Sequence, residues 1–411
     1  MSTRDSVRAG APPGAAAAAA AAAAVQGPLH PLLAAAGEYP FLRVDRMRQE
    51  LCPPGLPLIN FGIGDPRERT PEFVRQTLRD AVPEVSSYPA TAGLPELRAA
   101  AAGWLTRRFG VRVDPDRELL PLNGTKEGVF LLALAVVNRD AARRTVVIPT
   151  PAYPVYEPSA RFAGADVHEV PLRSEDGWRF DPSRVPDEVW RRTALLWLNV
   201  PHNPTGATLD RAALSAIAEL ARRHGFWVGA DEAYADVWFN SPPPSMLECG
   251  TDNVIAFHTL SKRSAMTGYR SGFMAGDARL MAALGRFRPN VGVATPEFVQ
   301  RAAIAAWSDD AHAETQRRVY AAKRERVAAE FRRRGWVIEA SEATFYLWTK
   351  APGGDDWGWA ERLMKKGIVP APGSMFGDTG KGYVRWALVP TLEQCVEAMA
   401  RLDNSADGVS G

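Results

Sequence analysis

Between residues 145 and 259, short continuously apolar segments alternate with amphipathic ones, and this pattern narrows the choice of fold more than any other feature. The apolar segments, which we predict to be strands, are residues 145–149, 194–199, 226–230 and 254–259. Residues 211–224 show the helical period between two of them. Strands that are apolar at every position are buried on both faces, as in parallel sheets covered by helices. The sequence therefore predicts an α/β fold with a mainly parallel sheet flanked by helices.

Polar residues follow each of the four predicted strands. These stretches are residues 150–153, 199–206, 231–234 and 261–262. In open α/β sheets, ligands bind outside the carboxyl ends of the strands. We therefore expect the four strand ends to form one binding site.

Lys262 is the most informative residue at these strand ends. It is one of only seven lysines in the chain, and it follows an apolar strand that we expect to be buried. Partial burial lowers the pKa of a lysine, and the neutral amine can then attack a carbonyl group. Thr259, Ser261 and Arg270 around it would suit a phosphate group. A carbonyl-binding lysine beside a phosphate site is what pyridoxal phosphate requires; the alternative is a surface lysine with incidental hydroxyl neighbours.

A second candidate phosphate site lies at residues 123–127, where a short strand at 119–122 runs into an apolar helix at 128–137. Gly124 and Thr125 at a helix start would leave free N–H groups at the positive end of the helix dipole. The alternative is an ordinary helix cap. The glycines at Gly62 and Gly64 do not form a dinucleotide fingerprint, because Arg67 stands where the third glycine would be.

A chain of 411 residues is long enough for two packed domains. We predict an Ala-rich disordered tail at 1–27, an arm at 28–58 that joins the small domain, a large domain at 59–288, and a small α+β domain at 289–411. In the small domain, a long helix from 296 to about 334 is expected to be interrupted near 309–312.

Charge and cysteine content limit the possible partners. The chain has 49 basic and 47 acidic residues, which does not favour nucleic acid or a membrane surface. The three cysteines are far apart and form no Cys/His cluster, so we expect no disulfide framework, no metal site and a reducing cytoplasm. The sequence contains no run of about 18 strongly apolar residues, so we expect no transmembrane helix.

Four motifs together resemble a known family. They are Asn199-Val200-Pro201-His202-Asn203-Pro204-Thr205-Gly206, Asp231-Glu232-Ala233-Tyr234, Ser261-Lys262 with Arg270, and Arg385. In this order and spacing they resemble the class I/II aminotransferases of pyridoxal phosphate (PLP) fold type I, over about residues 38–400. The resemblance implies a large domain with a mainly parallel sheet, a smaller α+β C-terminal domain and a homodimer.

The resemblance implies a role for each residue around the cofactor ring. Lys262 would bind PLP covalently and then move a proton, and Asp231 would pair with the pyridine nitrogen. Tyr234 and Asn203 would bind the ring's 3′ oxygen, and Tyr153 would lie over the ring. The residues alone leave other roles open: a helix cap for Asp231, a turn for Asn203 and core packing for Tyr153.

The resemblance also implies residues for the phosphate, the substrate and the partner subunit. Those expected at the phosphate are Thr259, Ser261, Arg270, Gly124, Thr125 and Lys126. Arg385 would bind the substrate α-carboxylate with its planar fork, beside Asn203 and the backbone of Gly64. Tyr88 would reach the phosphate site of the partner subunit. By position alone, Arg385 would instead be a surface residue at a strand edge.

Finer resemblance points to diaminopimelate chemistry. The stretches at residues 61–67, 123–127, 196–199, 259–264 and 266–273 resemble N-succinyldiaminopimelate and L,L-diaminopimelate aminotransferases. We expect amino transfer between glutamate and N-succinyl-2-amino-6-oxopimelate, with L,L-diaminopimelate, aspartate or aromatic substrates as alternatives. Candidates for the distal acid group are the arm at 39–43 and the stretch at 286–295, where Arg286 and Arg288 would either meet that group or be solvated.

Two rival functions share this fold. A PLP-dependent C–S β-lyase would use the same lysine, and no residue separates it from an aminotransferase. A PLP-binding regulator would carry a DNA-binding domain ahead of residue 38, and the preceding Ala-rich segment is too short for one.

Overall fold

The computed structural model describes residues 30–34, 39–292 and 294–403. The chain divides into two units, residues 1–39 and 40–411. The first unit contains helix α2 (Pro31–Ala34). The tail predicted at residues 1–27 lies outside the described residues.

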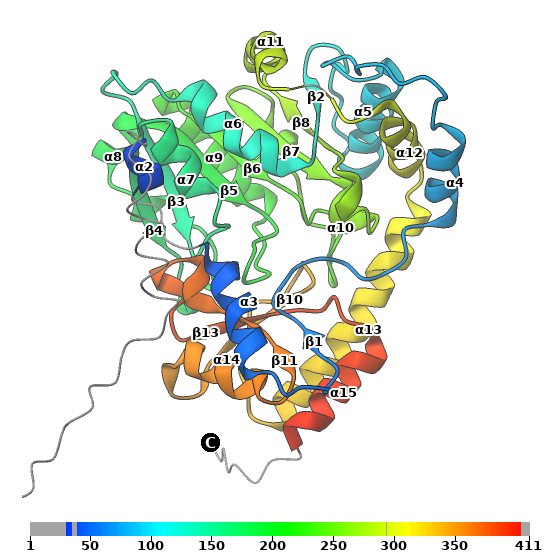
Figure 1. The fold of residues 1–411 in the computed structure, drawn as a ribbon. Helices are drawn as coiled ribbons and strands as arrows, with labels where there is room; N and C mark the ends of the chain where they lie inside the picture. Colours follow the sequence, from blue (N-terminus) through cyan, green and yellow to red (C-terminus); the bar gives the residue numbers. More distant parts are fainter. Residues whose placement is uncertain (1–29, 35–38, 293, 404–411) are drawn as a thin grey trace, which may run out of the picture. The chain divides into compact units, whose positions relative to one another are not determined.

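The larger unit contains a seven-stranded sheet in the order β2-β8-β7-β6-β5-β3-β4 (Figure 1). Its strands are β2 (Leu119–Leu122), β3 (Thr145–Thr150), β4 (Asp166–Pro171), β5 (Thr193–Asn199), β6 (Trp227–Asp231), β7 (Val254–Thr259) and β8 (Gly272–Gly276). Strands β4, β3, β5, β6 and β7 are parallel, and β8 joins β7 and β2 by antiparallel pairing. The predicted mainly parallel sheet is confirmed.

The sequence pattern did not predict two of these strands, β4 and β8. Strand β4 is an edge strand with two exposed acidic side chains, Asp166 and Glu169, so it has no continuous apolar run. Strand β8 is only five residues long and has glycine at both ends, which are weak strand signals.

Helices cover both faces of this sheet because successive strand residues point to opposite sides (Figure 1). Leu196 and Val228 pack in one core cluster with α5 (Pro95–Phe109), α9 (Arg211–His224) and α12 (Glu297–Ser308). Leu195 and Trp197 pack in another cluster with α6 (Thr125–Val136), α7 (Tyr156–Phe162) and α11 (Ala278–Phe287). The remaining helices of this region are α4 (Glu72–Asp80), α8 (Asp187–Arg192) and α10 (Leu260–Arg263).

Helix α9 illustrates how the sequence sets element ends. Asp210 precedes it and its side chain accepts a hydrogen bond from the Ala213 amide at 2.8 Å, which is an N-cap. Gly225 follows it with φ 71°, the left-handed conformation that ends many helices. The predicted bounds, residues 211–224, are confirmed.

A second, antiparallel sheet has the order β12-β13-β10-β9. Its strands are β9 (Ile338–Glu339), β10 (Tyr346–Lys350), β12 (Ala371–Pro372) and β13 (Tyr383–Ala387). Strand β1 (Ile59–Asn60) pairs in parallel with β11 (Ile368–Val369), so a segment from before the large sheet lies with the C-terminal elements. The helices here are α3 (Pro40–Leu51), α13 (Ala311–Arg333), α14 (Asp356–Met364) and α15 (Leu392–Asp403) (Figure 1).

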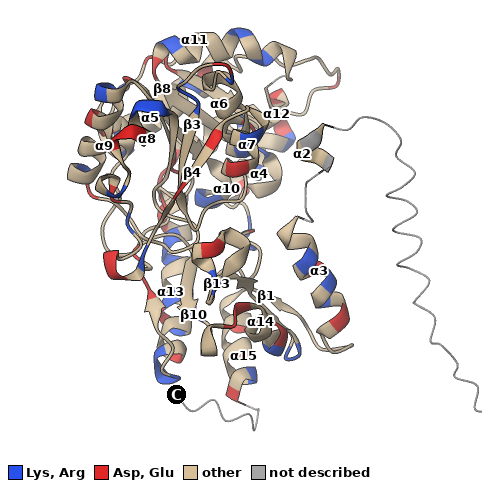
Figure 2. Cartoon of the chain, turned by 90° about the vertical axis from the view of Figure 1, so that its left-hand side faces the viewer, with Lys and Arg blue, Asp and Glu red and all other residues tan. Residues whose placement is uncertain are grey.

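The expected interruption of the long helix is present, because α12 ends at Ser308 and α13 begins at Ala311. The domain boundaries at residues 58 and 288 remain predictions. Basic and acidic residues are interspersed along the helices (Figure 2). Within the described ranges, no helix combines the length and apolar character needed to cross a membrane.

Candidate active site

Lys262 lies on α10, a single helical turn directly after strand β7. The Thr259 side chain caps this turn by accepting a hydrogen bond from the Ser261 amide at 3.1 Å. The amine of Lys262 donates a hydrogen bond to the Gly64 carbonyl oxygen. Burial lowers the pKa of Lys262 to about 8, against the opposing effect of the Asp65 carboxylate. A substantial fraction of this amine is therefore neutral near physiological pH, as a nucleophile or base requires.

Asp231 ends the neighbouring strand β6, and its side chain is 5% exposed. The Tyr156 hydroxyl donates to one carboxylate oxygen at 2.7 Å, and the Ala233 amide approaches the other at 3.3 Å. The Asn199 amide group donates to the Asp231 backbone carbonyl at 2.7 Å, which ties the ends of β5 and β6 together. Burial raises the pKa of Asp231, while the hydrogen bond from Tyr156 and the charge of Lys262 lower it.

Tyr156 is a site residue that the sequence analysis missed. Its ring stacks on Trp197 with 4.8 Å between centroids, and it comes from the first turn of α7. Burial raises its pKa well above the usual value, so it acts as a hydrogen-bond donor to Asp231. The sequence signal for it was weak, since a tyrosine in a Pro-rich stretch predicts core packing equally well.

Arg385 on β13 is 2% exposed and faces the strand ends of the large sheet. One terminal nitrogen donates to the Asn203 side-chain oxygen at 2.9 Å, and the other donates to the Gly62 carbonyl at 2.6 Å. Its guanidinium lies over the Tyr346 ring at 4.2 Å. A guanidinium has five N–H groups, so a planar pair remains for a carboxylate. The structure thus brings Arg385 and Asn203 together and does not place Arg385 at the surface.

Tyr346 on β10 was also missed. Its hydroxyl lies 2.7 Å from the hydroxyl of Tyr234, which follows Asp231 by three residues. A Cβ at Gly64 would lie 2.1 Å from the Tyr346 hydroxyl oxygen, so only glycine fits at position 64. Burial raises the pKa of Tyr234 well above the usual value, and the nearby Arg385 charge opposes that shift.

The candidate phosphate site combines a helix start with a guanidinium. Gly124 precedes α6 with φ 78°, and a Cβ there would lie 2.1 Å from an Arg270 terminal nitrogen. Arg270 therefore lies against bare backbone at the positive end of a twelve-residue helix. Ser261, which precedes Arg270 in the sequence, accepts a hydrogen bond from the Thr259 hydroxyl at 2.9 Å. Thr125 is the first residue of α6, and Lys126 is exposed on its first turn.

The roles predicted for Tyr153 and Tyr88 stay predictions. Tyr153 is half-buried, with its ring 5.7 Å from that of Tyr156. Tyr88 is 95% exposed in the single chain.

The proposed distal role of Arg288 is wrong. This side chain is 2% exposed and donates to the Pro121 carbonyl at 2.6 Å and to Glu127 at 3.0 Å. It joins α6 to the end of β2 and is not available to a substrate. Arg286 is exposed in the last turn of α11. In the arm, Arg43 lies 3.7 Å over the Trp357 ring of α14.

Known proteins resemble the chain along most of its length. The family model for aminotransferase class I and II matches residues 57–402. An LL-diaminopimelate aminotransferase of Nitratidesulfovibrio vulgaris is 36% identical over 90% of this chain and 97% of its own. One of Syntrophobacter fumaroxidans is 38% identical over 89% of this chain and 95% of its own. The structure of a probable N-succinyldiaminopimelate aminotransferase from Thermus thermophilus matches with TM-score 0.82 and 34% identity, over 88% of this chain and 98% of that one.

The side chains present fit the cofactor of that family. Lys262 offers a partly neutral amine, and Asp231 offers a buried carboxylate with one strong donor, suited to a further N–H. The cradle at Gly124, which a Cβ would fill, together with Arg270 suits a phosphate. When bound, the cofactor supplies an electron-withdrawing ring that stabilises negative charge at the substrate α-carbon. By sequence, fold and the fit of its site, the chain belongs to the aminotransferase class I and II family, whose members depend on pyridoxal phosphate.

Proposed function

We propose that this enzyme reversibly transfers one amino group of LL-diaminopimelate to 2-oxoglutarate, which gives glutamate and the 2-oxo acid derived from diaminopimelate. The observation that carries the proposal is the name shared by eight curated relatives, LL-diaminopimelate aminotransferase, at 33–38% identity over 89–90% of this chain. This favours the alternative substrate of the sequence analysis over the N-succinyl compound that it placed first.

In this proposal each group has a defined task. Arg385 binds the α-carboxylate, with Asn203 and the Gly62 carbonyl fixing the plane of its guanidinium. The amine of Lys262 takes a proton from the donor's α-carbon and returns it during the reverse half-reaction. Asp231, oriented by Tyr156, holds the cofactor's ring nitrogen in its protonated form. Because glutamate and the second donor use one site in turn, the kinetics should be ping-pong.

Asp65 supports a donor whose distal end carries a free ammonium group beside its carboxylate. It follows Gly64 directly, and its side chain accepts a hydrogen bond from the Thr267 hydroxyl at 2.6 Å while remaining 36% exposed. In this proposal the distal end of the donor lies beside Asp65, whose carboxylate favours the free ammonium group there and disfavours the extra carboxylate that succinylation adds. Arg67, 3.7 Å from Asp65 and 62% exposed, would instead favour the N-succinyl compound.

The N-succinyl compound stays the second candidate because of the Thermus thermophilus structure, which is 34% identical and carries that probable assignment. The two donors differ in one feature, since succinylation replaces an ammonium by a neutral amide ending in a carboxylate. An Asp65→Asn variant should therefore lower kcat/KM for LL-diaminopimelate and leave or raise that for the N-succinyl donor.

The test measures glutamate formation by the PLP-loaded enzyme from a panel of amino donors, with 2-oxoglutarate as the acceptor. LL-diaminopimelate should exceed N-succinyl-LL-diaminopimelate, aspartate, aromatic and branched donors in kcat/KM. A tenfold advantage for any of these would overturn the substrate and leave the aminotransferase activity standing. Pyruvate released from cystathionine would indicate the β-lyase instead. Lys262→Ala is the inactive control.

We also infer a homodimer that acts in the cytoplasm. Tyr88 is 95% exposed and Val85 is 80% exposed, although both are large apolar residues that a partner surface would bury. The three cysteines, Cys52, Cys249 and Cys395, are all unpaired, which suits a reducing compartment. Sedimentation of the purified protein would test the dimer.

A further inference from the structure

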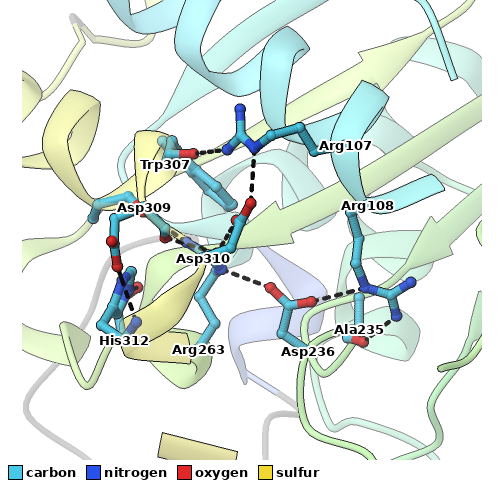
Figure 3. Close-up of polar contacts among 11 residues, drawn as sticks. Arg107, Arg108, Ala235, Asp236, Arg263, Trp307, Asp309, Asp310 and His312 are labelled. Atoms are coloured by element: carbon cyan, nitrogen blue, oxygen red, sulfur yellow. Dashed lines mark hydrogen bonds and ion pairs between the residues drawn. The ribbon is translucent and has the colours of Figure 1, made fainter. Parts of the chain in front are cut away.

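The residue after Lys262 anchors the lysine turn to a cluster of ion pairs (Figure 3). Arg263 is 3% exposed, and its Nε donates to the Asp236 carboxylate at 2.6 Å. Its two terminal nitrogens donate to the Ala306 carbonyl at 2.8 Å and to Asp310 at 3.1 Å. Arg263 thus connects three segments that are far apart in sequence.

One of these segments carries the other catalytic groups. Asp236 follows Asp231 and Tyr234 in the loop after β6, and it is 7% exposed. Its second carboxylate oxygen accepts from Arg108 at 2.9 Å, and Arg108 also donates to the Ala235 carbonyl at 2.9 Å (Figure 3). The ion pair between Arg263 and Asp236 therefore links the lysine turn directly to the loop of Asp231 and Tyr234.

The other segment is the junction of α12 and α13. Asp310 lies immediately before α13, and Ala306 belongs to the last turn of α12. The residue directly after the turn, Ser264, makes a second contact there, with 2.8 Å between its hydroxyl and the His312 ring. His312 is held in turn by Asp309 at 2.7 Å (Figure 3). Both residues that follow Lys262 are therefore fixed to one junction.

Such anchoring is necessary because α10 has only four residues. An isolated helical turn is unstable, so its position must come from its neighbours. The Lys262 amine must also lie accurately, because an error of about 1 Å in a reacting group can lower a rate on the order of 100-fold. We propose that Arg263 is a positioning residue, which holds the lysine turn in place against the loop of Asp231 and Tyr234 and so sets the position of the Lys262 amine. This inference rests on the aminotransferase chemistry of Lys262 and is independent of the donor.

The test compares Arg263→Lys with Arg107→Lys in the full-length holoenzyme. Lysine keeps the charge facing Asp236 but cannot contact Asp236, Ala306 and Asp310 together. Arg107 is the matched control, since it donates to the same Asp310 at 2.7 Å and to the Trp307 carbonyl at 2.6 Å (Figure 3). Its hydrogen bonds among the described residues go to that junction and none goes to the lysine turn.

Three readouts separate positioning from a purely structural role. The first is the pH midpoint of the visible absorbance of the Lys262-bound cofactor, which needs no substrate. We expect it to shift by at least about half a pH unit in Arg263→Lys and to stay unchanged in Arg107→Lys. We expect kcat to fall on the order of 10- to 100-fold in Arg263→Lys, with KM changed by less than about threefold, because the carboxylate-binding residues are untouched. The melting temperature should fall in both variants.

An unchanged absorbance midpoint and kcat in Arg263→Lys would overturn the proposal, and so would equal changes in Arg107→Lys. If Arg263→Lys does not fold, the Ser264→Ala variant tests the positioning role instead, because it removes only the contact with His312. It should shift the midpoint in the same direction by a smaller amount, and no shift would count against positioning. Failure of the diaminopimelate panel would leave this test intact, because the absorbance is measured without donor.

Discussion

Replacing Arg385 by lysine should lower kcat/KM for the amino donor by about 30- to 160-fold. The guanidinium is 2% exposed and already bonds Asn203 at 2.9 Å and the Gly62 carbonyl at 2.6 Å, while offering further N–H groups. A lysine ammonium cannot keep both contacts and also bind a carboxylate through two parallel bonds. Losing a hydrogen bond to a charged group costs about 2–3 kcal/mol, and each 1.36 kcal/mol is about tenfold in rate.

The assay is the half-reaction with a single donor, and the absorbance of the bound cofactor measures its progress. An amine without an α-carboxylate serves as a comparison substrate, because its rate should be low in both proteins and change little. Cofactor content should stay normal, since we propose that Arg385 binds the substrate carboxylate and not the cofactor. Arg324→Lys is the matched control, as Arg324 donates to the Ser341 hydroxyl at 3.0 Å and to its carbonyl at 2.9 Å outside the site.

Unaltered kinetics in Arg385→Lys would show that another group binds the carboxylate. An equal loss in Arg324→Lys would mean that the effect comes from general destabilisation.

Three other variants test separate parts of the molecule. Gly124→Ala should weaken PLP binding on the order of tenfold, because a Cβ would lie 2.1 Å from Arg270 at φ 78°, and equilibrium dialysis measures it. Mixing inactive Lys262→Ala with Tyr88→Ala chains should restore activity if the partner subunit completes each site; no recovery despite demonstrated subunit exchange would contradict this. Burial raises the pKa of Glu232 to about 8 in the folded chain, so its burial destabilises the protein increasingly as pH rises from about 4.5 to 8. Glu232→Gln should reduce the fall in melting temperature as the pH rises through this range. Parallel plots of melting temperature against pH for the two proteins would contradict the raised pKa of Glu232.

The sequence by itself determined the large sheet and the residue types at its ligand edge. Continuous apolar runs predict buried parallel strands, and the carboxyl ends of such strands lie along one edge. Asp231 could be named because it comes directly after one of these runs, and Lys262 because it lies three residues after the end of another. The role of Gly64 came from the family resemblance, and the structure adds that its bare backbone allows the close approach of Tyr346.

Tertiary structure alone decided how those residues are held. Tyr156 reaches Asp231 across 75 positions, and Tyr346 reaches Tyr234 across 112. Arg288, which could equally have been solvated, is buried against Glu127 across 161 positions. Periodicity and motifs describe neighbours along the chain, whereas these partners meet only because strands and helices from distant segments pack together. The anchoring of the lysine turn by Arg263 is of the same kind, since its acceptors Asp236 and Asp310 come from two other segments of the chain.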